Sequence, residues 1–177
     1  EPHLPVGIEL VDLDHGDGDD VATLVVVAGA DRMRRRQAAV AHAVGRRFMC
    51  CDVPTADAEW SALVREATIT GRGIVLEVGD TLDVTTRRWL DRSSHLVWAL
   101  SGRVAPPIDQ LPARPWLEVH ASSDDPSDEE WSATFGPGVD RTHRLTYDQM
   151  HRVQRSREAV GGDIDAAVEI LGPVMPQ

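Results

Sequence analysis

The chain has 177 residues and a formal net charge of −11, with 42% hydrophobic and 27% charged residues. These values are typical of one soluble globular domain with a real core, and they argue against a general binder of nucleic acid or anionic membranes. No apolar run approaches the ~20 residues of a membrane-spanning helix and no signal peptide is visible, so we expect a cytoplasmic protein. The chain begins at Glu1 without a methionine, so we expect it to be a piece of a longer protein.

Residues 1–22 are expected to form an acidic N-terminal segment. Its aspartates suggest a calcium loop, but an EF-hand loop counted from Asp12 would place Gly16, Asp17 and Thr23 at positions 5, 6 and 12. Those positions require an acidic or amide residue, a glycine and a glutamate, so a solvated acidic turn is the better interpretation. The histidines show no metal-ligand spacing either, and no metal site is predicted.

Five short apolar runs alternate with helical patterns between residues 23 and 136. This alternation predicts an α/β domain in which helices cover both faces of a parallel sheet. The expected strands are Thr23–Ala28, Phe48–Cys51, Gly73–Glu77, His95–Ser101 and Trp116–His120. Cys50 and Cys51 are adjacent in the second run, so we expect buried, reduced thiols that point to opposite faces.

Three helices are predicted between these strands. The first covers Arg34–Val44, and the third covers Thr86–Arg92. The second is expected to begin at an N-cap on Thr55 and to bury one face with i, i+3, i+4, i+7 spacing. That face contains Trp60, Leu63, Val64 and Ala67.

Helical signals follow the fifth run. Asp125-Pro126 predicts an N-cap followed by a proline at the first helical position. Thr146 and Gln149 predict a capping box, and Asp163 is expected to start a last helix. Residues 137–177 are therefore predicted to form a small helical, lid-like segment.

The segment from Gly29 to Arg36 stands where a phosphate-binding P-loop, G-x-x-x-x-G-K-[ST], would follow the first strand. Gly29 supplies the first glycine, but Arg34, Arg35 and Arg36 replace the second glycine, the lysine and the Mg²⁺-binding hydroxyl, and the chain contains no lysine. Arg34 adds a bulky side chain to the loop, Arg35 has a planar guanidinium in place of a compact ammonium, and Arg36 puts a cation at a position where Mg²⁺ needs an oxygen ligand. Each of these changes opposes the binding of phosphate or Mg²⁺. In the alternative interpretation no P-loop existed here, and the arginines form a solvated helix face.

Glu77 to Leu82, E-V-G-D-T-L, places carboxylates after the third strand, where an ATPase holds Mg²⁺ and orients water. An acidic strand end followed by a turn is the alternative interpretation. The hexapeptide resembles the D-E-A-D-A-L segment of AAA+ ATPases. In that resemblance Glu77 stands at the metal-site aspartate, Val78 replaces the catalytic glutamate, and Asp80 and Leu82 match.

A later stretch, Leu100–Leu111, is similar to the AAA+ region that runs from the sensor-1 strand through a proline-containing loop. Ser101 falls on the sensor-1 position, and Arg114 falls in the region of the arginine finger. The likeness in order and spacing extends from about Leu24 to Leu171. It implies a five-stranded parallel sheet of order 5-1-4-3-2 with a small C-terminal helical lid, and self-association into rings or filaments.

The chain thus resembles a degenerate AAA+ ATPase domain, similar to the N-terminal inactive module of tandem AAA+ ATPases from high-GC bacteria, including those of contractile injection systems. The resemblance implies an assembly or partner-docking module of a larger ATPase, without a cofactor or catalytic residues of its own. Other protein modules or AAA+ subunits would be its partners.

Three alternatives remain open. The chain could be a working AAA+ domain that uses ATP and Mg²⁺, with Arg35 in place of the lysine, or it could bind anions at this helix start without hydrolysis. A receiver-like signalling domain is disfavoured, because that family requires an acidic pair after the first strand and a lysine after the fifth. An unrelated α/β domain is the third alternative.

Overall fold

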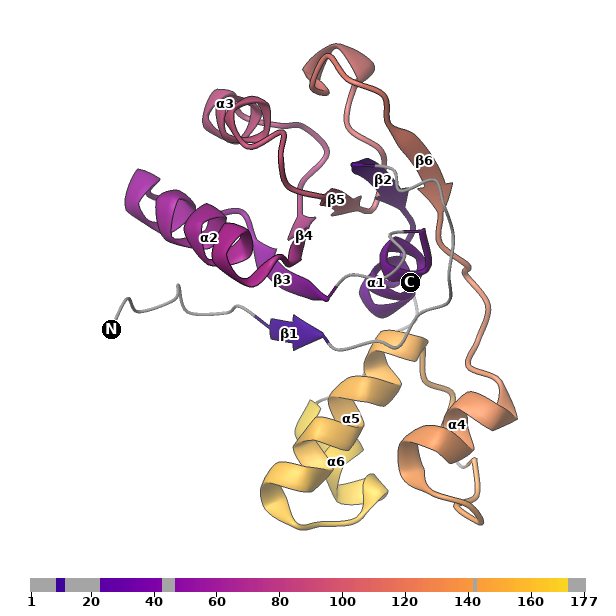
Figure 1. Ribbon diagram of the computed structural model, residues 1–177. Helices are drawn as coiled ribbons and strands as arrows, with labels where there is room; N and C mark the ends of the chain where they lie inside the picture. Colours follow the sequence, from indigo (N-terminus) through magenta and orange to yellow (C-terminus); the bar gives the residue numbers. More distant parts are fainter. Residues whose placement is uncertain (1–8, 12–22, 43–46, 142, 172–177) are drawn as a thin grey trace. The chain divides into compact units, whose positions relative to one another are not determined.

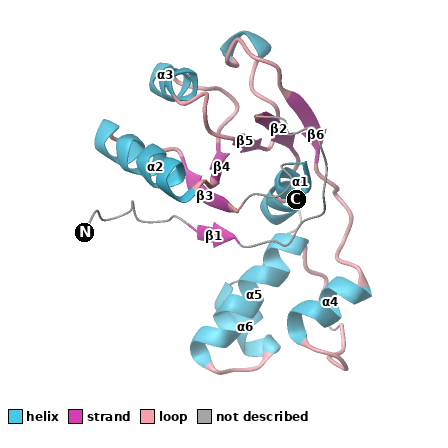
Figure 2. Ribbon diagram, in the orientation of Figure 1, coloured by secondary structure: helices cyan, strands magenta, loops and turns pink. Residues whose placement is uncertain are grey.

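The computed structural model describes residues 9–11, 23–42, 47–141 and 143–171, and the chain divides into two compact units, Glu1–Ser122 and Ser123–Gln177. The first unit contains β1 (Glu9–Val11), β2 (Leu24–Ala28), α1 (Arg32–His42), β3 (Phe48–Asp52), α2 (Asp57–Thr70), β4 (Gly73–Glu77), α3 (Val84–Arg92), β5 (Trp98–Gly102), a 3₁₀ turn η1 (Ile108–Gln110) and β6 (Leu117–His120) (Figure 1). The second unit contains α4 (Asp128–Phe135), α5 (Tyr147–Val160) and α6 (Ile164–Leu171), and is helical throughout its regular structure (Figure 2).

The strands of the first unit form one sheet in the order β1-β3-β4-β5-β2-β6. The five strands from β2 to β6 are parallel, and their order confirms the predicted 5-1-4-3-2 arrangement. The sixth strand, β1, was not predicted, and it pairs antiparallel with β3 at the edge of the sheet. The rest of the acidic segment, including the aspartates considered for calcium, lies outside the described residues.

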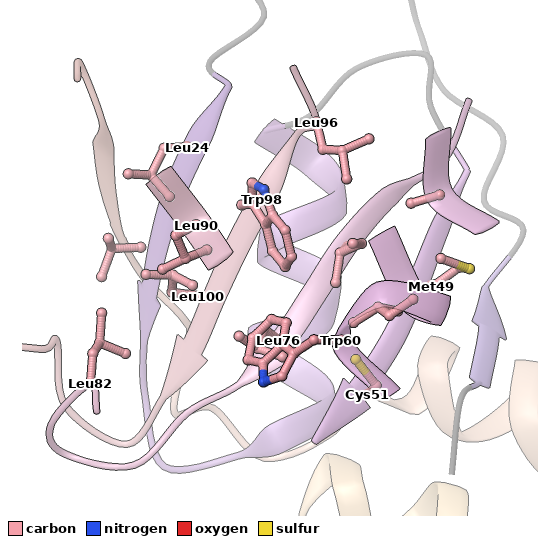
Figure 3. Packing of buried hydrophobic residues seen from close by; sticks show 14 residues of the cluster. Leu24, Met49, Cys51, Trp60, Leu76, Leu82, Leu90, Leu96, Trp98 and Leu100 are labelled. Atoms are coloured by element: carbon pink, nitrogen blue, oxygen red, sulfur yellow. The ribbon is translucent and has the colours of Figure 1, made fainter. Parts of the chain in front are cut away.

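Helices cover the sheet on both faces, as the alternating pattern predicts. Leu24 and Val26 of β2 face one hydrophobic cluster, which α2 and α3 close with Trp60, Leu63, Ala67 and Leu90. Figure 3 shows this cluster, with Trp60 and Trp98 at its centre. Val25 and Val27 face the other cluster, under Ala39 and Val40 of α1. Because β2 is buried on both faces, its sequence is a continuous apolar run rather than an alternating one.

The two cysteines point to opposite faces of β3, as predicted. Cys51 belongs to the cluster under α2, Cys50 belongs to the cluster under α1, and both are free thiols. Burial raises the pKa of the Cys51 thiol to about 12, so this residue stays protonated and unreactive at neutral pH.

The predicted N-cap of α2 was wrong by one residue. Ala56, not Thr55, is the N-cap, and the side chain of Glu59, at position N3, accepts the hydrogen bonds at the start of the helix. Its Oε2 accepts hydrogen bonds from the backbone N–H groups of Thr55, at 2.8 Å, and Ala56, at 3.2 Å. The Thr55 hydroxyl also donates to this oxygen, at 3.1 Å, instead of capping the helix. The backbone donors of Thr55 and Ala56 hold the pKa of Glu59 below its usual range.

In the second unit the N-cap of α4 is Ser127, not Asp125 as predicted, because Ser127 forms a reciprocal capping box with Glu130. The Ser127 N–H donates to Glu130 Oε2 at 2.8 Å, and the Glu130 N–H donates to Ser127 Oγ at 3.1 Å. The predicted capping box between Thr146 and Gln149 at the start of α5 is confirmed.

The helical unit has its own core. That core consists of Trp131, Phe135, Leu145, Met150, Val153 and Ala167. Since Trp131 and Phe135 come from α4, this helix belongs with α5 and α6, and the unit starts at Ser123. The structural division therefore differs from the predicted lid boundary at residue 137. None of the helices in the described parts of the chain has the length and apolar character needed to cross a bilayer.

Candidate functional site

Three strand ends meet at the carboxyl edge of the sheet and position the predicted site residues. β4 and β2 flank β5, so Glu77, Ser101 and the turn at Gly29 lie side by side. The register pairs Glu77 directly with Ser101, and the Gly29 N–H donates to the carbonyl oxygen of Gly102 at 3.1 Å. This is the edge at which open α/β sheets place their binding sites.

Arg35, in the first turns of α1, hydrogen-bonds to all three strand ends. Its Nε donates to Ser101 Oγ at 2.8 Å, its Nη1 donates to the Gly29 carbonyl at 2.7 Å, and its Nη2 donates to Glu77 Oε2 at 2.8 Å. Ser101 Oγ in turn donates to the same Glu77 oxygen, at 3.0 Å. We call these four residues the Arg35 network. The side chains of Arg35 and Glu77 are only 7% and 9% exposed, so these contacts lie largely out of water.

Two further arginines share the Glu77 carboxylate. Arg32 Nε lies 3.3 Å and Arg36 Nε lies 3.5 Å from Glu77 Oε1, while Arg32 also pairs with Asp52 Oδ1 at 3.1 Å. Arg32, Arg35 and Arg36 follow an i, i+3, i+4 spacing, which places them on one side of a helix. Glu77 is therefore the carboxylate on which three guanidinium groups converge.

The solvated-face interpretation of the arginines is wrong, because Arg34, Arg35 and Arg36 are all buried. The Nη1 of Arg34 donates to Gln37 Oε1 at 3.2 Å. The burial of three consecutive arginines could not be predicted from their residue type, since arginine is among the most exposed residues in proteins.

The helix α1 begins earlier than a P-loop would permit. Asp31 Oδ1 accepts a hydrogen bond from the Arg34 N–H at 2.9 Å, and the Asp31 carbonyl accepts one from the Arg35 N–H at 3.0 Å. The helical residues start at Arg32, whereas the sequence predicted Arg34 as the first. Backbone donors that a P-loop directs at phosphate are thus used inside the helix, and a carboxylate stands at the helix start. An N-cap aspartate before a helical run was the signal that could have revealed this.

Gly29 has a packing role in this structure. A Cβ at this position would lie 2.9 Å from Ala121 Cβ, in the segment that follows β6. The Ala121 N–H donates to the Ala28 carbonyl at 2.8 Å, so the two backbones cannot separate easily. The retained glycine is explained by this close approach without any phosphate.

We expect Gly29→Ala to lower the free energy of unfolding by about 1–3 kcal/mol, because the added methyl group overpacks the contact with Ala121. Urea unfolding followed by circular dichroism would measure the loss. Gly79→Ala is the matched control, since a Cβ at Gly79 has no atom within 4 Å and the expected change is small. Equal stability of the two variants would contradict the packing role.

Two predicted site residues lie away from the network. Asp80 is exposed in the turn after β4. Arg114 precedes β6 and donates from Nη1 to the carbonyl oxygen of Ser94, which precedes β5. Arg114 is therefore at the amino edge of the sheet, opposite the Arg35 network, and burial lowers its pKa.

The chemistry available at the carboxyl edge is that of a closed ion-pair cluster. Glu77 and Ser101 are engaged by Arg35, so neither presents a free base or nucleophile. Within the described residues, no group of three or more histidine, cysteine, aspartate or glutamate side chains could hold a metal ion. Comparison with protein-family models, with curated proteins and with solved structures gives no match to this chain.

Proposed function

We propose that this chain is a catalytically degenerate AAA+ ATPase-like domain, which serves as an assembly or partner-docking module within a larger cytoplasmic ATPase. Its partners would be other protein modules or AAA+ subunits. The resemblance assigns the P-loop lysine position to Arg35, the metal-site carboxylate to Glu77 and the sensor-1 position to Ser101. One observation carries the proposal: the Arg35 guanidinium hydrogen-bonds to Glu77, to Ser101 and to the Gly29 carbonyl at once.

This bonding pattern favours loss of nucleotide chemistry. A P-loop lysine must reach the terminal phosphates, and the acidic residue must be available to Mg²⁺. Here Arg35 Nη2 bonds to Glu77 Oε2, and Arg32 and Arg36 lie at ion-pair distance from the other carboxylate oxygen, Oε1. Binding Mg-ATP would require breaking several charge-assisted hydrogen bonds, each of which contributes roughly 1.5–3 kcal/mol.

Exposed apolar side chains are compatible with a docking role. Val84 begins α3 after β4, and Val104 and Ile108 follow β5, with exposed fractions of 76%, 50% and 73%. These side chains come from the segments that follow β4 and β5, the strands that contribute Glu77 and Ser101. Their exposure leaves apolar area that an assembly contact would remove from water.

Titration calorimetry with Mg-ATP separates this proposal from a working ATPase in which Arg35 replaces the lysine. We expect no binding heat at micromolar concentrations and no phosphate release above a protein-free blank. Micromolar binding by the wild-type chain would overturn the proposal, and hydrolysis that Glu77→Gln abolishes would favour the working ATPase. Binding without turnover would leave only the weaker alternative of a nucleotide-binding domain.

A further inference from the structure

We infer that the carboxyl-edge site is a binding site for a planar guanidinium cation, which the Arg35 side chain occupies as an internal ligand. This inference rests on the proposed function, because it identifies what fills the site of the degenerate domain. It goes further in assigning the site a ligand class opposite in charge to a nucleotide phosphate.

The groups around the guanidinium are hydrogen-bond acceptors. They are the carbonyl oxygens of Gly29 and Ala30, Ser101 Oγ and Glu77 Oε2, at 2.7, 3.4, 2.8 and 2.8 Å from the Arg35 nitrogens. A phosphate cradle needs the reverse, an array of backbone N–H donors directed at the ligand. The turn after β2 therefore presents the polarity of a cation site.

The arrangement of acceptors matches the shape of a guanidinium. Nε, Nη1 and Nη2 each have their own partner on a different segment: β5, the turn after β2, and β4. The guanidinium fork is planar and rigid, so one group can satisfy three partners at fixed directions, which a compact ammonium on a flexible stem does less well. Ser101 donates its proton to Glu77, which leaves an oxygen lone pair for Arg35 Nε.

The acceptor oxygens that face Arg35, rather than the net charge of the site, select a cation. Glu77 lies within the site, and the Asp31 carboxylate caps the helix that begins beside it. A phosphate in the place of the Arg35 guanidinium would meet three acceptors, Glu77 Oε2 and the carbonyl oxygens of Gly29 and Ala30, while Arg32 and Arg36 lie beside the other oxygen of Glu77, Oε1. Removing Arg35 is therefore expected to leave a vacancy for guanidinium and not for phosphate.

The internal ligand joins the ends of β2, β4 and β5 without a bound nucleotide. In a domain that depends on nucleotide, the strand ends at this edge would become ordered when the nucleotide binds, because a ligand that binds only the folded state stabilises it by mass action. Here the tethered side chain supplies the contacts permanently. The domain would consequently keep one arrangement of its strand ends at all nucleotide concentrations.

Chemical rescue of Arg35→Ala in the full chain tests this inference. Thermal unfolding followed by circular dichroism is measured in millimolar guanidinium chloride, in sodium chloride of equal ionic strength and in equimolar urea. We expect guanidinium to raise the midpoint of Arg35→Ala saturably by about 3 °C over the salt control. Urea has the same planar shape without the charge, so it should give no rise. The wild type, in which the site is filled, should show no rise, and neither should Arg35→Met, whose terminal methyl group would block the position of Nε.

A midpoint that guanidinium does not raise, or that urea raises equally, would overturn the inference. If Arg35→Ala is unfolded in buffer, the same titration is read as recovery of the far-ultraviolet dichroism, and no recovery has the same meaning. Mg-ATP added to the wild-type chain distinguishes the two proposals. Stabilisation by Mg-ATP would contradict the proposed function, whereas failed rescue without Mg-ATP binding would contradict only the guanidinium site.

Discussion

Glu77→Gln is expected to lower the free energy of unfolding by about 3–5 kcal/mol, because it removes the shared counter-charge of a buried ion cluster. The Arg35 and Arg36 side chains are each 7% exposed, and Glu77 faces both of them as well as Arg32. Glutamine keeps the shape of the side chain and one acceptor oxygen, so the loss reports the missing charge. Urea unfolding monitored by circular dichroism at neutral pH measures the change.

Asp52→Asn is the control for Glu77→Gln. The Asp52 carboxylate pairs with Arg32 at 3.1 Å, but its side chain is 77% exposed. An exposed pair of this kind contributes roughly 0–1 kcal/mol, so the control should unfold almost as the wild type does. If Glu77→Gln lost no more stability than Asp52→Asn, the burial of the arginines would not depend on the charge of Glu77. The ion pairs around Glu77 would then contribute little to the free energy of unfolding.

Most of the sheet was predictable because β2, β3, β4 and β5 are buried along almost their whole length and therefore read as short apolar runs, whereas β6 is largely exposed. Leu24–Ala28 and Trp98–Gly102 are fully buried, and turn or helix signals bound each of them. The strand order came from the resemblance, since periodicity alone gives no order. The three residues Glu9–Val11 form β1, and an element of this length is too short to give a periodic signal.

The sequence predicted where the site residues lie, but it did not predict the hydrogen bonds that Arg35 forms with them. The sequence placed Gly29, Glu77 and Ser101 at strand ends, and the strand ends of a parallel sheet meet at one edge, where the structure brings these residues together. The direction of Arg35 was not expected, since it depends on where α1 begins. Asp31 captures the Arg34 N–H and shifts the helix start, which turns Arg35 towards Glu77. Capping competition of this kind is a local energy difference that a motif pattern does not contain.

The caps of the helical unit illustrate the same competition. Asp125 and Ser127 are both good N-cap residues, and only Ser127 is followed three residues later by a glutamate that can complete a capping box. Asp125 instead pairs with Arg144, at 3.2 Å. The sequence contained the deciding residue, Glu130, but the proline at position 126 gave the more familiar signal.

The second large effect is expected in the core beneath α2, where Trp60 joins the helix to the sheet. Its ring is fully buried, stacks on Trp89 with centroids 6.0 Å apart, and meets Trp98 of β5 at 6.3 Å. Trp60→Ala removes the largest side chain of α2 and leaves a cavity between helix and sheet. We expect a loss of about 3–5 kcal/mol in the free energy of unfolding, measured by urea denaturation.

Trp89→Ala is the control that distinguishes the contribution of core burial from that of aromatic stacking. Trp89 lies on the outer side of the pair, is only partly buried, and donates from Nε1 to Asp57 Oδ1 at 3.2 Å. Both variants remove the same ring stack, whose geometry contributes about 0.5–1.5 kcal/mol beyond area burial. Only Trp60→Ala opens a cavity against the sheet. Equal losses in the two variants would mean that α2 is held mainly by the stack, whereas the expected larger loss at Trp60 means that the helix is held by filling the core.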